Sequence, residues 1–213
     1  MAVDLPPPPP NPIAAVAPAM SSAVAQRVAD LAACGFGVKG MNGKKPPAKV
    51  AVFDASKKSS EERFFLLDFS KPEKPEVILT SRVAHGKGSD PKGKGIIEKF
   101  SNVVNSGATS LGLYRFAERY TGKHPGASWR LDGLTPGFND KARERAVVIH
   151  SSAYVTDWKV GRSLGCPALP KPIVDRMAKI GMTNALLIVD DGSDQLAQKL
   201  VCADDSKAGG RRS

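Results

Sequence analysis

The sequence has few aromatic residues, few cysteines and no long hydrophobic run, and each shortage argues against a class of protein. Aromatic residues make up 6% of the 213 residues, which leaves few side chains on which the bases of single-stranded nucleic acid could stack. No stretch approaches the ~20 consecutive apolar residues that cross a bilayer, so we expect no membrane span. Three cysteines cannot form a framework of disulfides, because at least one must stay unpaired.

Basic residues, by contrast, are in excess. The chain has 31 Lys and Arg against 21 Asp and Glu, which gives a net charge of +10 and a pI near 9.6. Residues 82–130 hold nine basic and only three acidic side chains. A nucleic-acid site usually interleaves such a run with aromatics, whereas here lysines alternate with glycines. We therefore expect no nucleic-acid partner, and a nucleic-acid binder is a rival interpretation that rests on net charge alone. The charge also fits a solvated surface or a site for another anion.

The chain begins with a proline-rich segment and a short helical one. Seven of the seventeen prolines lie within the first eighteen residues, so residues 1–19 are predicted to be an extended, disordered tether. Residues 20–46 are predicted to be a helix and a linker. Ser21 or Ser22 would cap this helix, its apolar residues have the 4,3 spacing of an amphipathic face, and Gly35 would end it.

The remainder favours a mainly β domain over residues 47–204, followed by a flexible tail at 205–213. Apolar runs succeed one another in hairpin-like order, which predicts an antiparallel sandwich or barrel with a few peripheral helices. A Gly- and Lys-rich loop at 86–107 is long enough to suggest a lid. We expect strands at 49–54, 63–69, 76–84, 111–118, 128–131, 146–150 and 185–190, a helical turn at 139–145 and a helix at 171–179.

Cys166 is the candidate nucleophile of this domain. It follows Gly161-Arg162-Ser163-Leu164-Gly165, where small residues permit a tight turn that exposes a side chain and aims amide groups at one point. A thiol needs a base near neutral pH, and His85, His124 and His150 are the three histidines. His150 ends an apolar strand, and the segment after it could bring Cys166 beside it.

Several segments are similar, in order, to the murein L,D-transpeptidase catalytic-domain family, a branch of the YkuD-type superfamily. The similarity extends from about residue 50 to residue 190. The segments that carry it are Phe64-Phe65-Leu66-Leu67-Asp68-Phe69, Val83-Ala84-His85-Gly86, Phe100-Ser101-Asn102, Ser110-Leu111-Gly112-Leu113-Tyr114, Leu131-Asp132-Gly133-Leu134, Pro136-Gly137-Phe138-Asn139-Asp140, Val148-Ile149-His150-Ser151-Ser152-Ala153-Tyr154-Val155 and Gly161-Arg162-Ser163-Leu164-Gly165-Cys166-Pro167-Ala168-Leu169.

The resemblance implies an enzyme that joins peptidoglycan stem peptides. Cys166 would attack the bond before the terminal D-residue of a tetrapeptide stem, release D-Ala and form a thioester, which an amine of a second stem would resolve as a 3→3 cross-link. His150 would move the proton. The amides of Gly165 and Cys166 would form the oxyanion hole, and Ser163 would support the turn or the thiol. Water as acceptor would instead make an L,D-carboxypeptidase.

The same resemblance suggests substrate-binding residues. Arg162 would bind a carboxylate, because the Arg that the wider superfamily places after its Cys is absent here; a surface ion pair is the alternative. His85 is either a cleft residue or a structural histidine. Asn102, Tyr114 and Ser151 are cleft candidates by position, with turn and core roles as alternatives for Asn102 and Tyr114.

Other expectations follow from the resemblance. Leu164 stands where the wider superfamily has a histidine, so a decayed, non-catalytic peptidoglycan-binding module is a rival interpretation. With Cys166 assigned, we expect Cys34 and Cys202 to be two buried thiols, with a disulfide as the alternative. No cofactor or metal is implied. Stem peptides are the expected partners, carbapenem-type β-lactams the expected inhibitors, and the periplasm or cell envelope the expected location.

Overall fold

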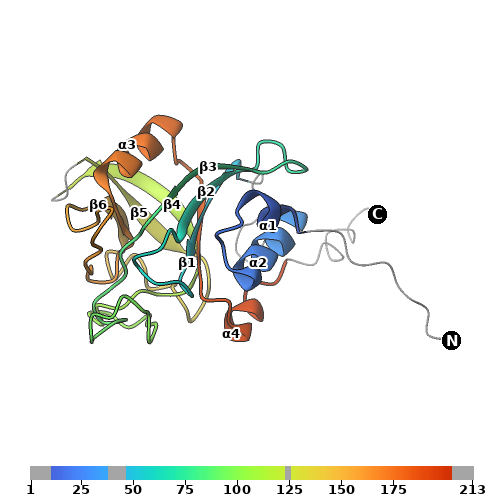
Figure 1. Ribbon diagram of the computed structural model, residues 1–213. Helices are drawn as coiled ribbons and strands as arrows, with labels where there is room; N and C mark the ends of the chain where they lie inside the picture. The colour runs from blue at the N-terminus through green and yellow to red at the C-terminus, as the bar shows by residue number, and fades with distance from the viewer. Residues whose placement is uncertain (1–10, 38–46, 123–125, 203–213) are drawn as a thin grey trace, which may run out of the picture.

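The computed structural model describes residues 11–37, 47–122 and 126–202, and the strands form its centre (Figure 1). His124 lies outside the described residues. The helices are α1 (Pro12–Val16), α2 (Ser22–Ala33), α3 (Lys171–Ile180) and α4 (Asp194–Ala197). The strands are β1 (Lys49–Asp54), β2 (Phe64–Asp68), β3 (Glu76–Ser81), β4 (Gly112–Thr121), β5 (Ala127–Gly133), β6 (Val148–Ser151), β7 (Ala168–Leu169) and β8 (Leu186–Asp190).

The eight strands form one sheet in the order β3-β2-β1-β8-β4-β5-β6-β7. The predicted mainly β fold is confirmed. Five of the strand pairings are antiparallel, as expected, but β1–β8 and β6–β7 are parallel. β8 is the last strand in the chain and yet lies between β1 and β4 in the sheet. All five residues of β8 are buried, as is typical of a strand covered on both faces.

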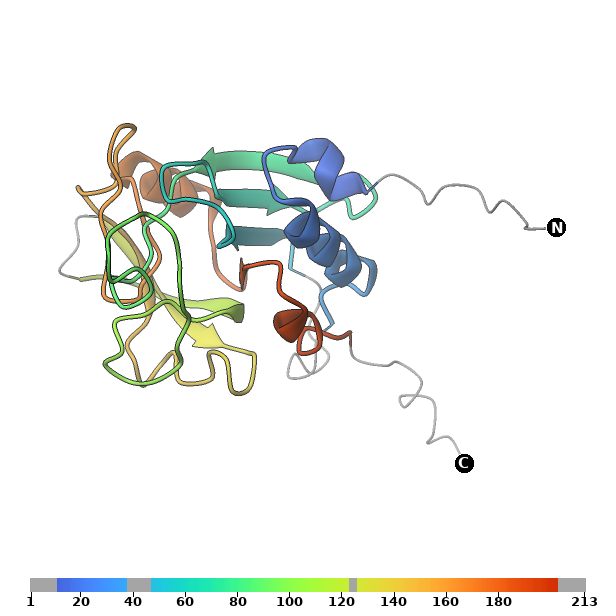
Figure 2. The same ribbon diagram turned by 60° about the horizontal axis from the view of Figure 1, so that its bottom comes forward.

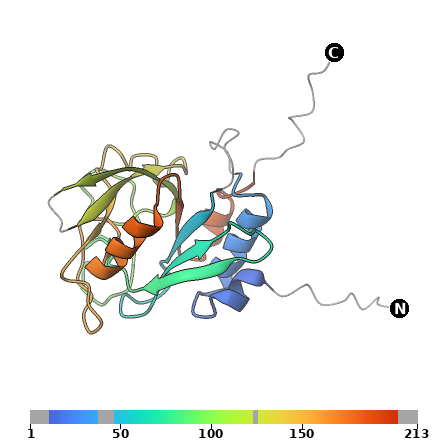
Figure 3. The same ribbon diagram turned by 90° about the horizontal axis from the view of Figure 1, so that it is seen from above.

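The two edges of the sheet come together, so that the sheet is nearly a closed barrel. Ala168 of β7 forms an isolated bridge with Ala84, which lies just beyond the end of β3. The Ala84 amide donates to the Ala168 carbonyl at 2.8 Å. Figure 3, seen from above, shows the sheet curving under α3, which contacts β5 and β6. The closure brings residues 83–87 against the segment that contains Cys166.

Helix α1 lies in the range predicted to be a tether, so that prediction is wrong from residue 11 onwards. The Asn11 side chain accepts hydrogen bonds from the amides of Ile13 (2.8 Å) and Ala14 (3.2 Å), which caps the helix. Pro12 fits the first turn because a proline there loses no intrahelical hydrogen bond. Ile13 is fully buried and so anchors the helix to the core.

Helix α2 is attached to the ends of the two parallel strands. The Ser21 amide donates to Asp54 at the end of β1, over 2.7 Å, and Arg27 pairs with Asp190 at the end of β8, over 2.5 Å. Both carboxylates are fully buried. The helix begins at Ser22 and Gly35 has a φ of +60°, as the sequence predicts. α1, α2 and α4 lie together at one side of the molecule, as Figure 2 shows.

A disulfide joins Cys34, at the C-cap of α2, to Cys202. The expectation of two separate thiols is therefore wrong. The two cysteines are 168 positions apart, and only the docking of α2 beside the C-terminal segment makes them neighbours, which spacing alone cannot reveal. Among the described residues, no helix has the length and apolar character needed to cross a bilayer.

Candidate active site

His150 lies on β6, and Cys166 lies in the turn just before β7, the neighbouring strand of the sheet. His150 is in β6 and pairs with Ala168 of β7, two residues after Cys166. The His150 amide donates to the Pro167 carbonyl at 3.3 Å. The pairing therefore fixes the relative position of the two backbones, as the sequence interpretation requires. Ser128, on the opposite side of β6, pairs with His150 from β5 and is fully buried.

The turn before Cys166 is held from outside by the segment after β3. The Ser163 amide donates to the His85 carbonyl, and the Lys87 amide donates to the Ser163 carbonyl, both at 2.8 Å. With the bridge between Ala84 and Ala168, these bonds hold the turn on both sides of Cys166. Gly86 must lack a side chain, because a Cβ there would lie 2.8 Å from the Cα of Gly165. The backbone around the candidate nucleophile is therefore preorganised.

Within the turn, Ser163 holds both ends. Its hydroxyl donates to the Cys166 carbonyl at 2.6 Å and accepts from the Gly165 amide at 3.1 Å. Gly165 has a φ of +118°, and a Cβ at this position would lie 2.8 Å from the Ala108 carbonyl oxygen. Ser163 thus supports the turn, as expected. The Gly165 amide is occupied by Ser163, so in this structure it is not the oxyanion donor that the sequence analysis expected.

The Cys166 thiol is the free one of the three cysteines, and it is partly exposed. Burial raises its pKa, while a hydrogen bond from the Val148 backbone and the charge of Arg145 act in the opposite direction. The net direction is upward, so the resting group is a protonated thiol at neutral pH. A nucleophilic thiolate then requires a base to take the proton.

His150 has the tautomer that such a base needs. Its Nδ1 lies 2.8 Å from the Ser151 carbonyl oxygen, and a carbonyl can only accept, so Nδ1 carries the hydrogen. In the neutral ring the lone pair is then on Nε2. His150 is almost fully buried, and so is Ser151. Ser151 was expected to contact substrate, and in this structure its backbone carbonyl orients the His150 ring.

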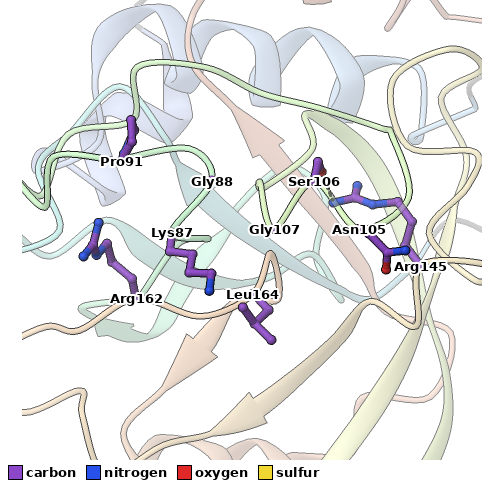
Figure 4. A pocket seen from close by; sticks show the side chains of 9 residues that line it. All are labelled: Lys87, Gly88, Pro91, Asn105, Ser106, Gly107, Arg145, Arg162 and Leu164. Carbon is purple, nitrogen blue, oxygen red and sulfur yellow. Dashed lines mark hydrogen bonds between the residues drawn. The ribbon is translucent and has the colours of Figure 1, made fainter.

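A cavity of about 620 Å³, which we call the active-site cavity, lies beside the turn. Figure 4 shows Lys87 and Arg162 on one side of Leu164 and Arg145 on the other. All four residues line the cavity, and none of the described residues that line it is acidic. Arg115, another basic residue of the range 82–130, pairs with Asp132 at 2.9 Å. The cavity therefore suits an anionic group.

Arg145 is the residue of this site that sequence reasoning missed. Its guanidinium donates to the carbonyls of Ser101 (2.8 Å) and Ala108 (2.5 Å) and to the hydroxyl of Ser110. It thereby holds the loop that faces Gly165. Burial lowers the pKa of Arg145, and the ionisable groups that favour its charge are Tyr114 and Cys166. The ion pairs found among the described residues do not include it.

His85 is buried beneath the loop, which contradicts its predicted contact with substrate. Its Nδ1 accepts from Arg63 at 2.8 Å, and its Nε2 faces Asp90 at 3.3 Å. Burial, followed by the charge of Arg63, lowers the pKa of His85 to about 4, so the ring is neutral. Asp90 in turn accepts from the amides of Lys94 (2.9 Å) and Gly95 (2.8 Å). The structural alternative for His85 is therefore correct: its side chain holds the loop at 86–107.

The model of one protein family, described as L,D-transpeptidase catalytic domain, matches residues 21–189.

The chain belongs to this L,D-transpeptidase family.

A search of curated proteins gives no match. Solved structures similar to the chain include an L,D-transpeptidase of Xylanimonas cellulosilytica, with 16% identity over 68% of this chain and 61% of that one, at a TM-score of 0.40. An L,D-transpeptidase of Mycobacterium smegmatis has 13% identity over 69% and 60%, also at 0.40. LD transpeptidase LdtMt1, solved in complex with imipenem, has 12% identity over 68% and 60%, again at 0.40. The chain thus spans about 60% of the length of these relatives.

The other predicted cleft residues of this L,D-transpeptidase domain have supporting roles. Tyr114 is almost fully buried and donates to the Ser110 carbonyl at 2.9 Å, and burial raises its pKa to about 12. Asn102 donates to Asp140 at 2.8 Å and accepts from the Lys141 amide at 3.2 Å. Tyr114 therefore follows its alternative role, core packing, whereas Asn102 attaches its loop to the segment at 140–141, which is not the turn role that was its alternative. Within the described parts of the chain, no cluster of three or more His, Cys, Asp and Glu could hold a metal.

Arg162 stays a candidate for carboxylate binding. Its guanidinium donates through Nη1 to the backbone carbonyl of Asp90, which holds the end of the side chain against the loop at 86–107. It also lines the active-site cavity (Figure 4). This placement is compatible with carboxylate binding and does not fit the surface ion pair that was the alternative.

Proposed function

We propose that the domain is a peptidoglycan L,D-transpeptidase that forms 3→3 cross-links through a thioester on Cys166. The observation that carries the proposal is the pairing of His150 with the strand that follows Cys166, in a chain of this family, beside a cavity lined by three cations. The boundaries of the catalytic domain, residues 47–204, and its location in the periplasm or cell envelope belong to the same proposal.

Acylation is the first half of the proposed reaction. Nε2 of His150 takes the thiol proton, and the sulfur attacks the carbonyl carbon of the bond between the L-centre and the terminal D-residue. The C–S bond forms, the C–N bond breaks, and His150 returns the proton to the leaving D-Ala amine. Since the Gly165 amide is engaged by Ser163, we assign the Cys166 amide as the backbone donor to the oxyanion.

Deacylation decides between two products. The side-chain amine of a diamino acid on a neighbouring stem attacks the thioester carbonyl, loses a proton to His150 and returns the thiol, which leaves a 3→3 cross-link. Attack by water gives a tripeptide stem, the carboxypeptidase alternative, with the same residues. A carbapenem-type β-lactam presents a strained amide to the same sulfur, so we expect it to acylate Cys166 and block the site.

The cavity accounts for recognition of the stem peptide. Stem peptides carry several carboxylates, and the guanidinium group of Arg162 can bind one through two parallel hydrogen bonds. Both Nη atoms of Arg145 are engaged by the loop at 101–110, so Arg145 contributes its positive charge. Lys87 adds a third positive charge. Arg145 is held by the loop at 101–110 and Arg162 by Asp90, so both are oriented before substrate arrives, which lowers the entropy cost of binding.

Incubation with disaccharide-free tetrapeptide stems tests the proposal. Mass spectrometry should show a dimer that lacks one D-Ala, and the dimer should be absent with Cys166→Ala. Monomers trimmed to the tripeptide would favour the carboxypeptidase alternative. Stem binding without any product from the wild type would favour the non-catalytic module, and dimers made by Cys166→Ala would refute the mechanism.

A further inference from the structure

A second groove, of about 690 Å³, lies on the segment that connects His150 to Cys166. Trp158 stands at its rim and is 86% exposed, the largest exposed fraction of any large hydrophobic side chain described. Pro170, Pro172 and Ile173 at the start of α3 form an apolar wall, and Arg82 and Thr156 supply polar groups. An exposed tryptophan needs an explanation, because its apolar ring is usually covered.

The turn that carries Trp158 is braced on both sides. Val155 and Val160 form an antiparallel bridge. The Thr156 amide donates to the Lys159 carbonyl at 2.8 Å, and the Lys159 amide donates to the Thr156 hydroxyl at 3.0 Å. Arg82 donates to the Ser60 carbonyl at 2.6 Å and lies 3.7 Å from the Asp157 carboxylate. Trp158 therefore sits on an ordered hairpin, which reduces the entropy lost when a ligand covers the ring.

The charge of this groove differs from that of the active-site cavity. The groove is lined by one cation, Arg82, and two acids, Glu62 and Asp157. The active-site cavity has three cations and no acid among its described lining residues. A carboxylate-rich peptide would be attracted to the cavity and not to the groove, whereas an uncharged ligand suits the groove.

The two sites are linked along one stretch of chain. A third cavity, of about 380 Å³, is lined by Lys159 and Gly161, and it shares Lys87 and Arg162 with the active-site cavity. Along this stretch, residues 155–158 line the groove, residues 159–162 line the third cavity, and Arg162 and Leu164 line the active-site cavity. Trp158 and Cys166 are eight steps apart in the chain, so their Cα atoms lie at most ~28 Å apart, and a sugar unit joined to a stem of four residues has to bridge no more than this distance.

We propose that this groove binds the glycan strand of peptidoglycan, specifically its uncharged N-acetylhexosamine units. The inference rests on the proposed function, because that function makes a glycan-linked peptide the substrate. The apolar face of a pyranose ring stacks on the indole of Trp158, while sugar hydroxyl and acetamido groups exchange hydrogen bonds with Arg82 and Thr156. The glycan is held at the groove while its attached stem extends along residues 159–164 to Cys166.

Binding can be tested without any turnover. The chain has two tryptophans; Trp129 is 2% exposed, so acrylamide quenches mainly Trp158. An N-acetylglucosamine tetramer should reduce the quenching constant at least twofold at saturation, and it should do so equally in a Val201→Ala control, which removes exposed apolar surface elsewhere. No protection in the wild type would overturn the inference. Loss of Trp158 exposure through self-association, seen as a concentration-dependent mass, would also overturn it.

Kinetics provide the second readout. Relative to the free tetrapeptide, a disaccharide-tetrapeptide donor should have about a tenfold lower KM in the wild type, which corresponds to ~1.4 kcal/mol. Trp158→Ala should abolish this difference, Trp158→Tyr should retain most of it, and kcat on the free tetrapeptide should not change. An equal KM for both donors would refute the groove assignment while leaving the transpeptidase proposal intact. Saccharide protection of Trp158 with no turnover of any stem would support the groove assignment and refute the transpeptidase proposal.

Discussion

The disulfide between Cys34 and Cys202 should stabilise the fold without contributing to the chemistry. It closes a loop of 168 positions between the end of α2 and the segment after α4. In the chain-entropy treatment, a closure of this length restricts the unfolded chain by about 5 kcal/mol. Measured disulfides typically deliver 2–4 kcal/mol, because the unfolded state retains structure. We therefore expect the double variant Cys34→Ser, Cys202→Ser to lose about 2–4 kcal/mol of unfolding free energy.

Urea unfolding of the wild type and the double variant measures this loss. With a slope of about 2 kcal/mol per M, the unfolding midpoint should fall by roughly 1–2 M. Dithiothreitol should lower the wild-type midpoint to that of the variant and leave the variant unchanged. Turnover in the absence of urea should be unaffected, since α2 and α4 lie on the other side of the molecule from the loop at 86–107 (Figure 1). A midpoint shift below 0.3 M, or an inactive but folded variant, would refute this reasoning.

Three further changes test the site. Gly165→Ala should cut turnover at least 100-fold, because its Cβ would meet the Ala108 carbonyl. The control Gly137→Ala, at a φ of +79° with nothing within 4 Å of the added Cβ, should leave turnover within twofold. Equal losses in the two variants would contradict the steric argument. Arg145→Met should move the pH profile of Cys166 alkylation to higher pH, and Arg145→Lys should restore part of it, because a positive charge lowers the thiol pKa; an unchanged profile in Arg145→Met would refute that role. The pKa of His85 is lowered in the fold to about 4, so its contribution is complete above its unfolded pKa of about 6.5 and is lost on acidification. His85→Gln preserves one acceptor and one donor, and between pH 7.5 and 5 the wild type should lose about 2 kcal/mol more unfolding free energy than this variant; parallel curves in urea would contradict it.

Much of the fold was predictable because the local patterns are strong. The strand at 49–54 was predicted with the bounds that it has, and Gly35 marked the end of α2 because its left-handed conformation favours glycine. The parallel pairing of β1 with β8 was not predictable, since the two strands meet only through the order of the whole sheet. Proline content alone predicts no helix α1, and the local signal for this helix is Asn11, which caps it.

The candidate site is likewise predictable from the sequence only in part. Cys166 and His150 stand in segments whose residue order carries the family resemblance, so their neighbourhood could be predicted. Arg145 could not, because its position near Cys166 depends on hydrogen bonds to a loop over 30 residues earlier in the chain. For His85, the segment lies beside the turn as predicted, but the predicted contact of its side chain with substrate is wrong. The His85 backbone carbonyl faces the turn, while its ring faces Arg63.

The central claim is that Cys166 forms a covalent acyl-enzyme with a stem peptide. Intact-protein mass spectrometry after rapid quenching with a tetrapeptide donor tests it most directly. We expect an added mass equal to the tripeptide acyl group, located on Cys166 by peptide mapping, absent in Cys166→Ala and formed far more slowly in His150→Gln. An unmodified Cys166 during active turnover, or an acyl group on another residue, would contradict the account.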